Sequence, residues 1–286
     1  MIKKITVIIG PTAAGKSDYA IKLAQKTNGE IISADAYQIY RGMNIGTAKV
    51  PLSERYSIPH HLVSTKDPKS PYNVTLFLEE TTKIIKKLKE QNKKIIICGG
   101  TGLYIKSLLY NYQFPQKSPP LKPPSKRLLT NKEEWDLLNQ IDPQTAHKIP
   151  YQNTRRVKRA LAIFNETGQK PSEAKQKTET IRNDIELIGL NYPRPILIQR
   201  INQRIDQMIQ NGLIEEVQQL LDDGVPQNAQ SLQAIGYKEI IEYLTKKYTK
   251  ENAIEKIKIK TRQFAKRQMT WFNTFPNVKW IYQNDT

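Results

Sequence analysis

Residues 4–17 read KITVIIGPTAAGKS, and this stretch decides the fold of the chain. The apolar, β-branched run from Lys4 to Ile9 is typical of a buried strand. Residues 10–17 match the phosphate-binding pattern G-x-x-x-x-G-K-[ST], and a helical pattern follows over 17–27. In such a loop the glycines permit a tight turn, so successive backbone N–H groups and the positive end of the helix face one anion. The stretch therefore predicts a binding site for a di- or triphosphate.

The predicted diphosphate-binding residues are those of the loop. They are Gly10, Pro11, Thr12, Ala13, Ala14, Gly15, Lys16 and Ser17. We expect Lys16 to neutralise phosphate oxygens and the Ser17 hydroxyl to bind Mg²⁺. Because such a loop recognises phosphates and not the group attached to them, it does not define the reaction by itself.

Strand and helix patterns alternate outside the loop. Short apolar runs predict further strands at 30–33, 94–98, 185–192 and 278–282. This alternation predicts an α/β fold with a mostly parallel sheet and helices on both faces.

The middle of the chain has a different composition. Residues 114–124 hold five prolines, which exclude a regular helix or central strand there, and a charged helical pattern follows at 133–167. We therefore expect a helical insertion at 110–183 within a core made of 1–109 and 184–286.

The charge of the chain favours nucleic acid as a partner. Lys and Arg number 45 and Asp and Glu 27 in 286 residues, which gives a net charge of +18. The single cysteine, Cys98, excludes a disulfide within the chain and a multi-cysteine zinc site. No apolar run is long enough for a membrane span, and the N-terminus lacks a signal-peptide cleavage site. We expect a cytoplasmic protein that does not enter a membrane.

Two further turns should lie beside the phosphate loop, because the carboxyl ends of parallel strands open onto one crevice. Asp35 follows the second strand and is either a general base, a ligand of Mg²⁺ through water, or a turn aspartate. Thr101, in Gly99-Gly100-Thr101-Gly102, either donates to a phosphate or bridging oxygen or caps a helix. His60 and His61 do not favour a metal site, since adjacent histidines point apart and no third ligand is near.

Two basic segments are candidates for nucleic-acid contacts. In the first, Val157 falls on the inner helix face and the charges on the outer face, which is either an RNA surface or a solvated face. This segment comprises Arg155, Arg156, Val157, Lys158 and Arg159. In the second, residues 263–272, helical spacing favours Phe264 and Trp271 as core residues over base-stacking platforms.

Taken together, the motifs of the chain resemble those of the tRNA dimethylallyltransferase family, also called tRNA isopentenyltransferases. The matching pieces are GPTAAGKS (10–17), ISADAYQIYRGMNIGTAK (32–49), PHHLV (59–63), ICGGTGLYIKSLL (97–109), NTRRVKRAL (153–161), RINQRIDQMIQNGLIEEV (200–217), QAIGYKE (233–239) and RQFAKRQMTWF (262–272). As a set in this order they are very specific, whereas no single piece beyond the phosphate loop is.

The resemblance implies transfer of a dimethylallyl group from dimethylallyl diphosphate to N6 of adenosine 37, beside the anticodon. It implies tRNAs that read codons beginning with U, a requirement for Mg²⁺, and N6-isopentenyladenosine as the product. It also implies a P-loop NTPase-like core whose helical insertion, 110–183, binds the tRNA anticodon stem-loop. We expect the enzyme to act as a monomer.

The resemblance also assigns roles to individual residues. Asp35 matches the general base, Thr101 the group near the bridging oxygen, and Lys16, Ser17 and Arg200 the diphosphate and metal contacts. The matching tRNA-binding residues are Asp35, Ala36, Tyr37, Gln38, Thr101, Arg155, Arg156, Val157, Lys158 and Arg159. The chain departs from the family at Ala36, where serine is usual.

The residues alone leave two other functions of the phosphate loop possible. An ATP-binding kinase of a small molecule or nucleotide would use Asp35 to orient an acceptor hydroxyl, but it does not explain the net charge of +18. An RNA-binding NTPase switch is disfavoured, because neither an Asn-Lys-x-Asp motif nor a strand ending in Asp-Glu is found.

Overall fold

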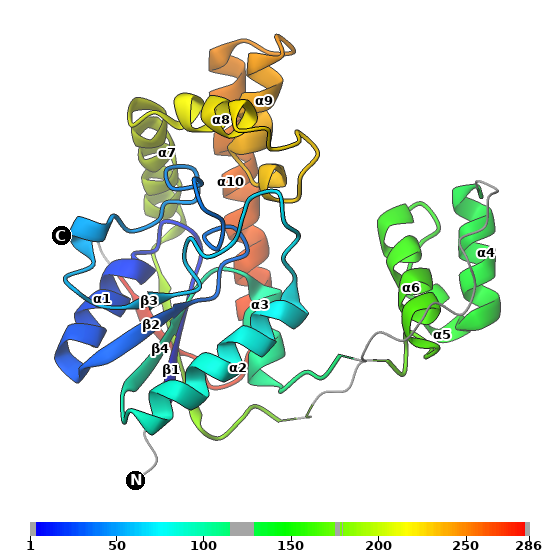
Figure 1. Ribbon diagram of the computed structural model, residues 1–286, viewed down its shortest axis with the longest axis horizontal. Coiled ribbons are helices and arrows are strands. Elements are labelled where there is room, and N and C mark those ends of the chain that lie inside the picture. The colour runs from blue at the N-terminus through cyan, green and yellow to red at the C-terminus, as the bar shows by residue number, and fades with distance from the viewer. Residues whose placement is uncertain (1–3, 115–128, 175–177, 179, 284–286) are drawn as a thin grey trace. The chain divides into compact units, whose positions relative to one another are not determined.

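The computed structural model describes residues 4–114, 129–174, 178 and 180–283 (Figure 1). The chain divides into two compact units, one made of Met1–Leu108 with Arg182–Thr286 and the other of Leu109–Ile181. The second unit begins one residue before the predicted insertion and ends two residues before the predicted end. The prolines at 115–124 lie outside the described residues.

A parallel sheet forms the centre of the first unit. Its strands are β1 (Ile5–Ile9), β2 (Gly29–Ser33), β3 (His60–His61), β4 (Lys94–Cys98), β5 (Ile185–Asn191) and β6 (Lys279–Tyr282). In the described part of the chain they pair in the order β3-β2-β4-β1-β5-β6, and every pairing is parallel. The predicted α/β fold with a parallel sheet is therefore confirmed. Only β3 was missed, because two residues leave no periodicity to detect.

Helices flank this sheet and extend beyond it. They are α1 (Lys16–Thr27), α2 (Val74–Glu90), α3 (Gly102–Leu109), α7 (Arg194–Gln210), α8 (Leu213–Asp222), α9 (Tyr237–Leu244) and α10 (Lys250–Phe272), with 3-10 turns η1 (Leu52–Glu54) and η2 (Ser231–Gln233). Helices α7 to α10 lie past the carboxyl ends of the strands (Figure 1). The chain turns between α7 and α8 at Gly212, whose φ of 95° suits glycine.

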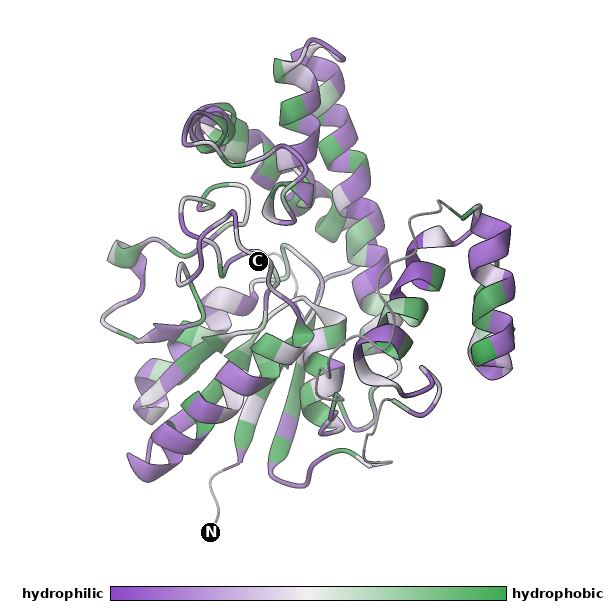
Figure 2. Cartoon of the chain, turned by 45° about the vertical axis from the view of Figure 1, so that its right-hand side comes forward, coloured by the Kyte–Doolittle hydropathy of each residue, from purple (hydrophilic) through white to green (hydrophobic). Residues whose placement is uncertain are grey.

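The core of the first unit explains why its central strands, β1 and β4, are mostly apolar. All five residues of β1 are buried, and Ile8, Ile96 and Leu190 from three strands pack with Ala20 and Ala24 of α1. Parallel strands covered on both faces need such continuous apolar runs. Figure 2 shows the hydrophobic colour predominating in the strands and both colours alternating around the flanking helices.

The second unit is a small helical body. Its described helices are α4 (Asn131–Ile141), α5 (Pro143–Ala146) and α6 (Thr154–Thr167). The single helical pattern expected at 133–167 is thus broken, first at Asp142, whose carboxylate accepts a bond from the Thr145 N–H at 3.1 Å and caps α5. A buried cluster of Leu138, Ala146, Val157 and Ala160 holds the helices together. Among the described residues, no helix is both long and apolar enough to span a membrane.

Candidate active site

The loop between β1 and α1 has the geometry of an anion cradle. Gly15 caps α1 with a φ of 73°, a conformation that favours glycine over other residues. Gly10 packs against β5, where an added Cβ would lie 2.3 Å from the Leu190 carbonyl oxygen. Lys16 Nζ donates to the Pro11 carbonyl at 2.7 Å, and burial lowers the pKa of Lys16 to about 8. A bound diphosphate would favour the charged lysine again.

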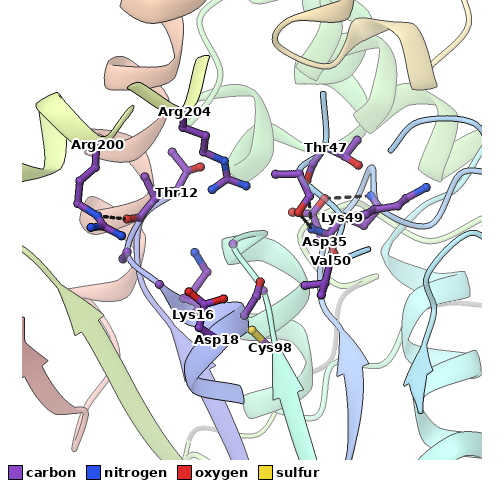
Figure 3. Close-up of a pocket in the computed structure, with 18 of the residues that line it drawn as sticks. Thr12, Lys16, Asp18, Asp35, Thr47, Lys49, Val50, Cys98, Arg200 and Arg204 are labelled. Carbon is purple, nitrogen blue, oxygen red and sulfur yellow. Dashed lines mark hydrogen bonds between the residues drawn. The ribbon is translucent and has the colours of Figure 1, made fainter. Parts of the chain in front are cut away.

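A cavity of about 570 Å³ opens over this loop. Residues 12–18 line it together with Asp35, Lys49, Cys98 and two arginines of α7 (Figure 3). The loop, the lysine and the arginines give the cavity a cationic wall opposite Asp35. Such a wall suits a ligand with a di- or triphosphate group.

The two arginines stand four residues apart on α7, so they point from one face of the helix. Arg200 donates from Nε to the Ala13 carbonyl at 3.1 Å, and its guanidinium lies 4.4 Å from the centre of the Tyr192 ring. Burial lowers the pKa of Arg204 from its usual value, while Asp35 and Asp18 oppose that shift. Arg200 was among the predicted residues and Arg204 was not, although its spacing from Arg200 is a signal that the sequence contains.

Asp35 is a turn aspartate whose side chain also lines the phosphate cavity. Its Oδ1 accepts bonds from the Tyr37 N–H at 2.9 Å and the Gln38 N–H at 3.3 Å, so it is a turn aspartate. It also lines the cavity over the phosphate loop. The turn fixes the direction in which the carboxylate points, as a positioned base requires.

Thr101 joins this turn to the next strand. Its Oγ1 accepts a bond from the Ala36 N–H at 3.0 Å, and its own N–H donates to the Ala34 carbonyl at 3.3 Å. Since a hydroxyl has one donor as well as its acceptors, the Thr101 O–H can donate to a ligand. The structure thus brings Asp35 and Thr101 together at the carboxyl ends of β2 and β4.

A second cavity, of about 490 Å³, adjoins the first at Asp35. The two cavities share Thr12, Asp35, Thr47, Ala48, Gly100, Arg204, Phe264 and Gln268. The second is lined mostly by apolar side chains, among them Ile201, Ile205, Met208, Leu213 and Ile257. The arrangement suits a reaction in which an anionic group and an apolar or planar group meet at one carboxylate. The sequence patterns did not predict this second cavity.

The wall that includes Thr47 and Lys49 is held by two charged side chains. Glu216 of α8 accepts bonds from the N–H groups of Asn44 at 2.7 Å, Ile45 at 2.8 Å and Gly46 at 3.1 Å. Lys49 donates to the Tyr40 carbonyl, to Asn44 Oδ1 at 3.2 Å and to Ser64 Oγ at 2.9 Å. Burial lowers the pKa of Lys49 to about 8.

Two aromatic residues differ from the expectation that they belong to the core. Trp271 is 38% exposed, and Lys106 Nζ lies 5.6 Å from the centre of its ring. Phe264 is only partly buried and lines both cavities. The expectation was wrong for Trp271, whose ring lies against Gly102 of α3 and lines the second cavity instead of the core.

The paired histidines make separate contacts. His60 Nδ1 lies 2.8 Å from the Ile58 carbonyl oxygen, and His61 Nε2 lies 2.7 Å from Glu30 Oε2. Among the described residues no cluster of three or more His, Cys, Asp or Glu side chains could hold a metal ion.

The basic run of the second unit lies on α6. Arg155, Arg156, Lys158 and Arg159 are exposed, whereas Val157 is completely buried. The Val157 side chain belongs to the core of the unit and is therefore not available to RNA. Helical spacing separates the two kinds of residue, as the sequence pattern indicated.

Known proteins resemble this chain over nearly its whole length. Residues 38–275 match the family model of IPP transferase, and residues 3–58 match that of isopentenyl transferase. The tRNA dimethylallyltransferase of Bacillus cereus is 44% identical over 289 residues, which cover 99% of this chain and 91% of the relative. That of Anoxybacillus flavithermus is also 44% identical, over 100% of this chain and 92% of its own length.

Solved structures lead to the same family. A crystal structure of a tRNA isopentenylpyrophosphate transferase from Bacillus halodurans is 37% identical, with a TM-score of 0.72, over 98% of this chain and 90% of that one. A eukaryotic dimethylallyltransferase, captured acting on tRNA, is 33% identical, with a TM-score of 0.88, over 99% of this chain and 74% of that one. The resemblance found in the motifs is confirmed, and the chain belongs to the IPP transferase family of tRNA dimethylallyltransferases.

Proposed function

We propose that the chain transfers a dimethylallyl group from dimethylallyl diphosphate to N6 of adenosine 37 in tRNAs that read codons beginning with U. The product is N6-isopentenyladenosine. The observation that carries the proposal is the meeting of a cationic cavity and an apolar cavity at Asp35. Family membership supports the same reaction.

The phosphate loop and its arginines act on the leaving group. As the bond between the allylic carbon and the bridging oxygen breaks, negative charge grows on the departing diphosphate. Backbone N–H groups, Lys16, Arg200 and Arg204 line the cavity where that charge would develop. Fixed donors of this kind stabilise a transition state without reorganising, which is commonly the largest catalytic term. The Thr101 hydroxyl would donate to the bridging oxygen.

Asp35 acts on the nucleophile. The exocyclic N6 forms its new bond to the allylic carbon and loses a proton, which passes to the Asp35 carboxylate. The turn that binds Oδ1 keeps this carboxylate at the junction of the two cavities. To reach it the base must leave the anticodon stack, and that cost must be offset by contacts with the rest of the tRNA.

Mg²⁺ fits the donor set beside the loop. Ser17 and Asp18 line the phosphate cavity next to Lys16, and Mg²⁺ sites commonly combine one or two protein oxygens with substrate phosphates and water. The Ser17 hydroxyl would hold the ion against the diphosphate. When bound, the ion supplies further charge stabilisation to the leaving group.

The second unit would hold the anticodon stem-loop. Its exposed arginines and lysine on α6 are suited to phosphate contacts, which fix register without reading sequence. We propose that the chain works as a monomer and, because its substrate is tRNA, in the cytoplasm.

Incubation with dimethylallyl diphosphate and unmodified tRNA, followed by mass analysis of nucleosides, tests the proposal. We expect N6-isopentenyladenosine at one position per tRNA, dependent on Mg²⁺. Absence of that nucleoside, together with phosphate transfer from radiolabelled ATP to a small acceptor, would instead support the kinase alternative.

A further inference from the structure

Gln268 of α10 has both ends of its side-chain amide bonded to backbone. Only 4% of the residue is exposed. Its Oε1 accepts a bond from the Thr12 N–H at 2.8 Å, and its Nε2 donates to the Gly100 carbonyl at 2.9 Å. A residue far along the chain thus bridges the phosphate loop and the turn after β4.

The bridge joins the two halves of the site. Thr12 lies in the loop that lines the phosphate cavity. Gly100 precedes Thr101, whose Oγ1 accepts the Ala36 N–H at 3.0 Å. A continuous set of contacts therefore runs from the diphosphate loop through Gln268 to the turn that holds Asp35.

The contacts around residue 268 fit few side chains other than glutamine. A Cβ added at Gly100 would lie 2.2 Å from Gln268 Nε2, so any side chain at position 100 would displace the amide. Glutamate has the same shape but, when ionised, no donor for the Gly100 carbonyl. Methionine has neither group, and asparagine is one methylene shorter. Of these side chains, only glutamine supplies both an acceptor and a donor at this length without having to be protonated.

We propose that Gln268 is a positioning residue that sets the distance between the diphosphate loop and Asp35. The proposal rests on the proposed function, in which the leaving diphosphate and the attacking N6 lie on opposite sides of one carbon. In such a displacement an error of about 1 Å costs on the order of 10²-fold in rate. Gln268 acts through two backbone groups and therefore affects the rate of transfer more than the binding of either substrate.

The test compares Gln268→Met and Gln268→Glu with matched changes at Gln25, an exposed residue of helix α1 that lines neither cavity. Transfer is measured in single turnover at saturating tRNA and dimethylallyl diphosphate. We expect Gln268→Met to slow transfer by roughly 10- to 100-fold with tRNA affinity within about twofold of wild type. Gln25→Met and Gln25→Glu should transfer at the wild-type rate.

The pH profile of Gln268→Glu supplies a readout that a general packing defect does not produce. A protonated glutamic acid has a carbonyl and an O–H, so it restores both bonds. The rate of this variant relative to wild type should rise as pH falls from 8 to 6, while the Gln268→Met ratio stays flat. Wild-type rates in both Gln268 variants, or identical pH profiles for the two, would overturn the proposal.

A double-mutant cycle extends the test to the neighbouring turn. Gly100→Ala displaces the same amide, so its defect should not add to that of Gln268→Met. Full additivity of the two defects would contradict the proposal. A wild-type chain that made no isopentenyladenosine would contradict the proposed function instead, which keeps the two failures distinguishable.

Discussion

The two units of the chain hold their functional side chains in opposite ways. In the first unit, Asp35 and Thr101 are bonded to backbone groups at 2.9–3.3 Å, and both line the second cavity. In the second, the cations of α6 are exposed, and two of them form long ion pairs, 3.6 Å for Lys158 with Glu134 and 4.0 Å for Arg159 with Glu166. Chemistry at a single bond needs fixed atoms, whereas contacts with a phosphate backbone tolerate mobile ones. The comparison therefore predicts that single substitutions in the first unit strongly slow transfer, whereas substitutions in the second unit have small effects on tRNA binding.

Asp35→Asn should produce the largest effect. It keeps the shape of the turn and removes the base, so transfer should slow by on the order of 10²–10⁴-fold while tRNA affinity stays near wild type. Single-turnover transfer and a filter-binding assay measure the two quantities. Asp223→Asn, at an exposed aspartate, is the control. Transfer at the wild-type rate would remove Asp35 from the mechanism.

Lys16 should make diphosphate binding dependent on pH. Its pKa is lowered to about 8, so below pH 8 the lysine is already charged, and above it binding must take up a proton. The affinity for dimethylallyl diphosphate should therefore fall by up to about tenfold per pH unit between pH 8 and 10. Titration calorimetry measures this slope. Lys16→Arg should flatten it, since arginine stays charged. If the slope persists, Lys49, whose pKa is also about 8, is its source.

Replacing Glu216 tests whether activity also depends on residues that fix the cavity wall without touching substrate. Glu216→Ala leaves three backbone N–H groups of residues 44–46 without their acceptor. Such losses cost about 1–3 kcal/mol each when the group stays buried, so the thermal midpoint should fall and transfer should slow by roughly tenfold. Glu215→Ala, at the exposed neighbour, should change neither quantity. Equal behaviour of the two variants would show that the wall needs no such anchor.

The smallest effect is expected for the paired change Arg155→Ala with Arg159→Ala. These residues lie four apart on one face of α6. If each contacts one phosphate, the slope of log K against log salt should flatten by about 1 to 2 units, since each contact contributes roughly 0.7–0.9. Affinity for dimethylallyl diphosphate should not change. The control removes equal charge from exposed Lys132 and Lys148. An unchanged slope would mean that these arginines only face solvent, and that the basic residues of α10 contact the tRNA instead.

The sequence predicted local features well and long-range ones poorly. The phosphate loop, Asp35 and Thr101 were found because each follows an apolar strand, and parallel strands bring their carboxyl ends together. Gln268 was missed because helix α10 reaches the site only through tertiary packing, whereas the spacing of Arg204 from Arg200 on α7 was a signal that could have revealed Arg204. The apolar cavity was missed for the same reason, since its lining comes from segments between Thr12 and Trp271. The prediction for Trp271 was wrong because helical spacing identifies the apolar face of a helix but not what packs against that face.

The bridge made by Gln268 also has a consequence for folding. The Thr12 N–H and Gln268 are 256 residues apart in sequence, and β1 lies between β4 and β5 at the centre of the sheet. Contacts of such separation form late and slowly, since the loop they close must be ordered first. During synthesis the phosphate loop emerges early but gains its last supports only after α10 has been made. A nascent chain would therefore hold an incomplete site for most of its synthesis, and could not modify tRNA before α10 has docked.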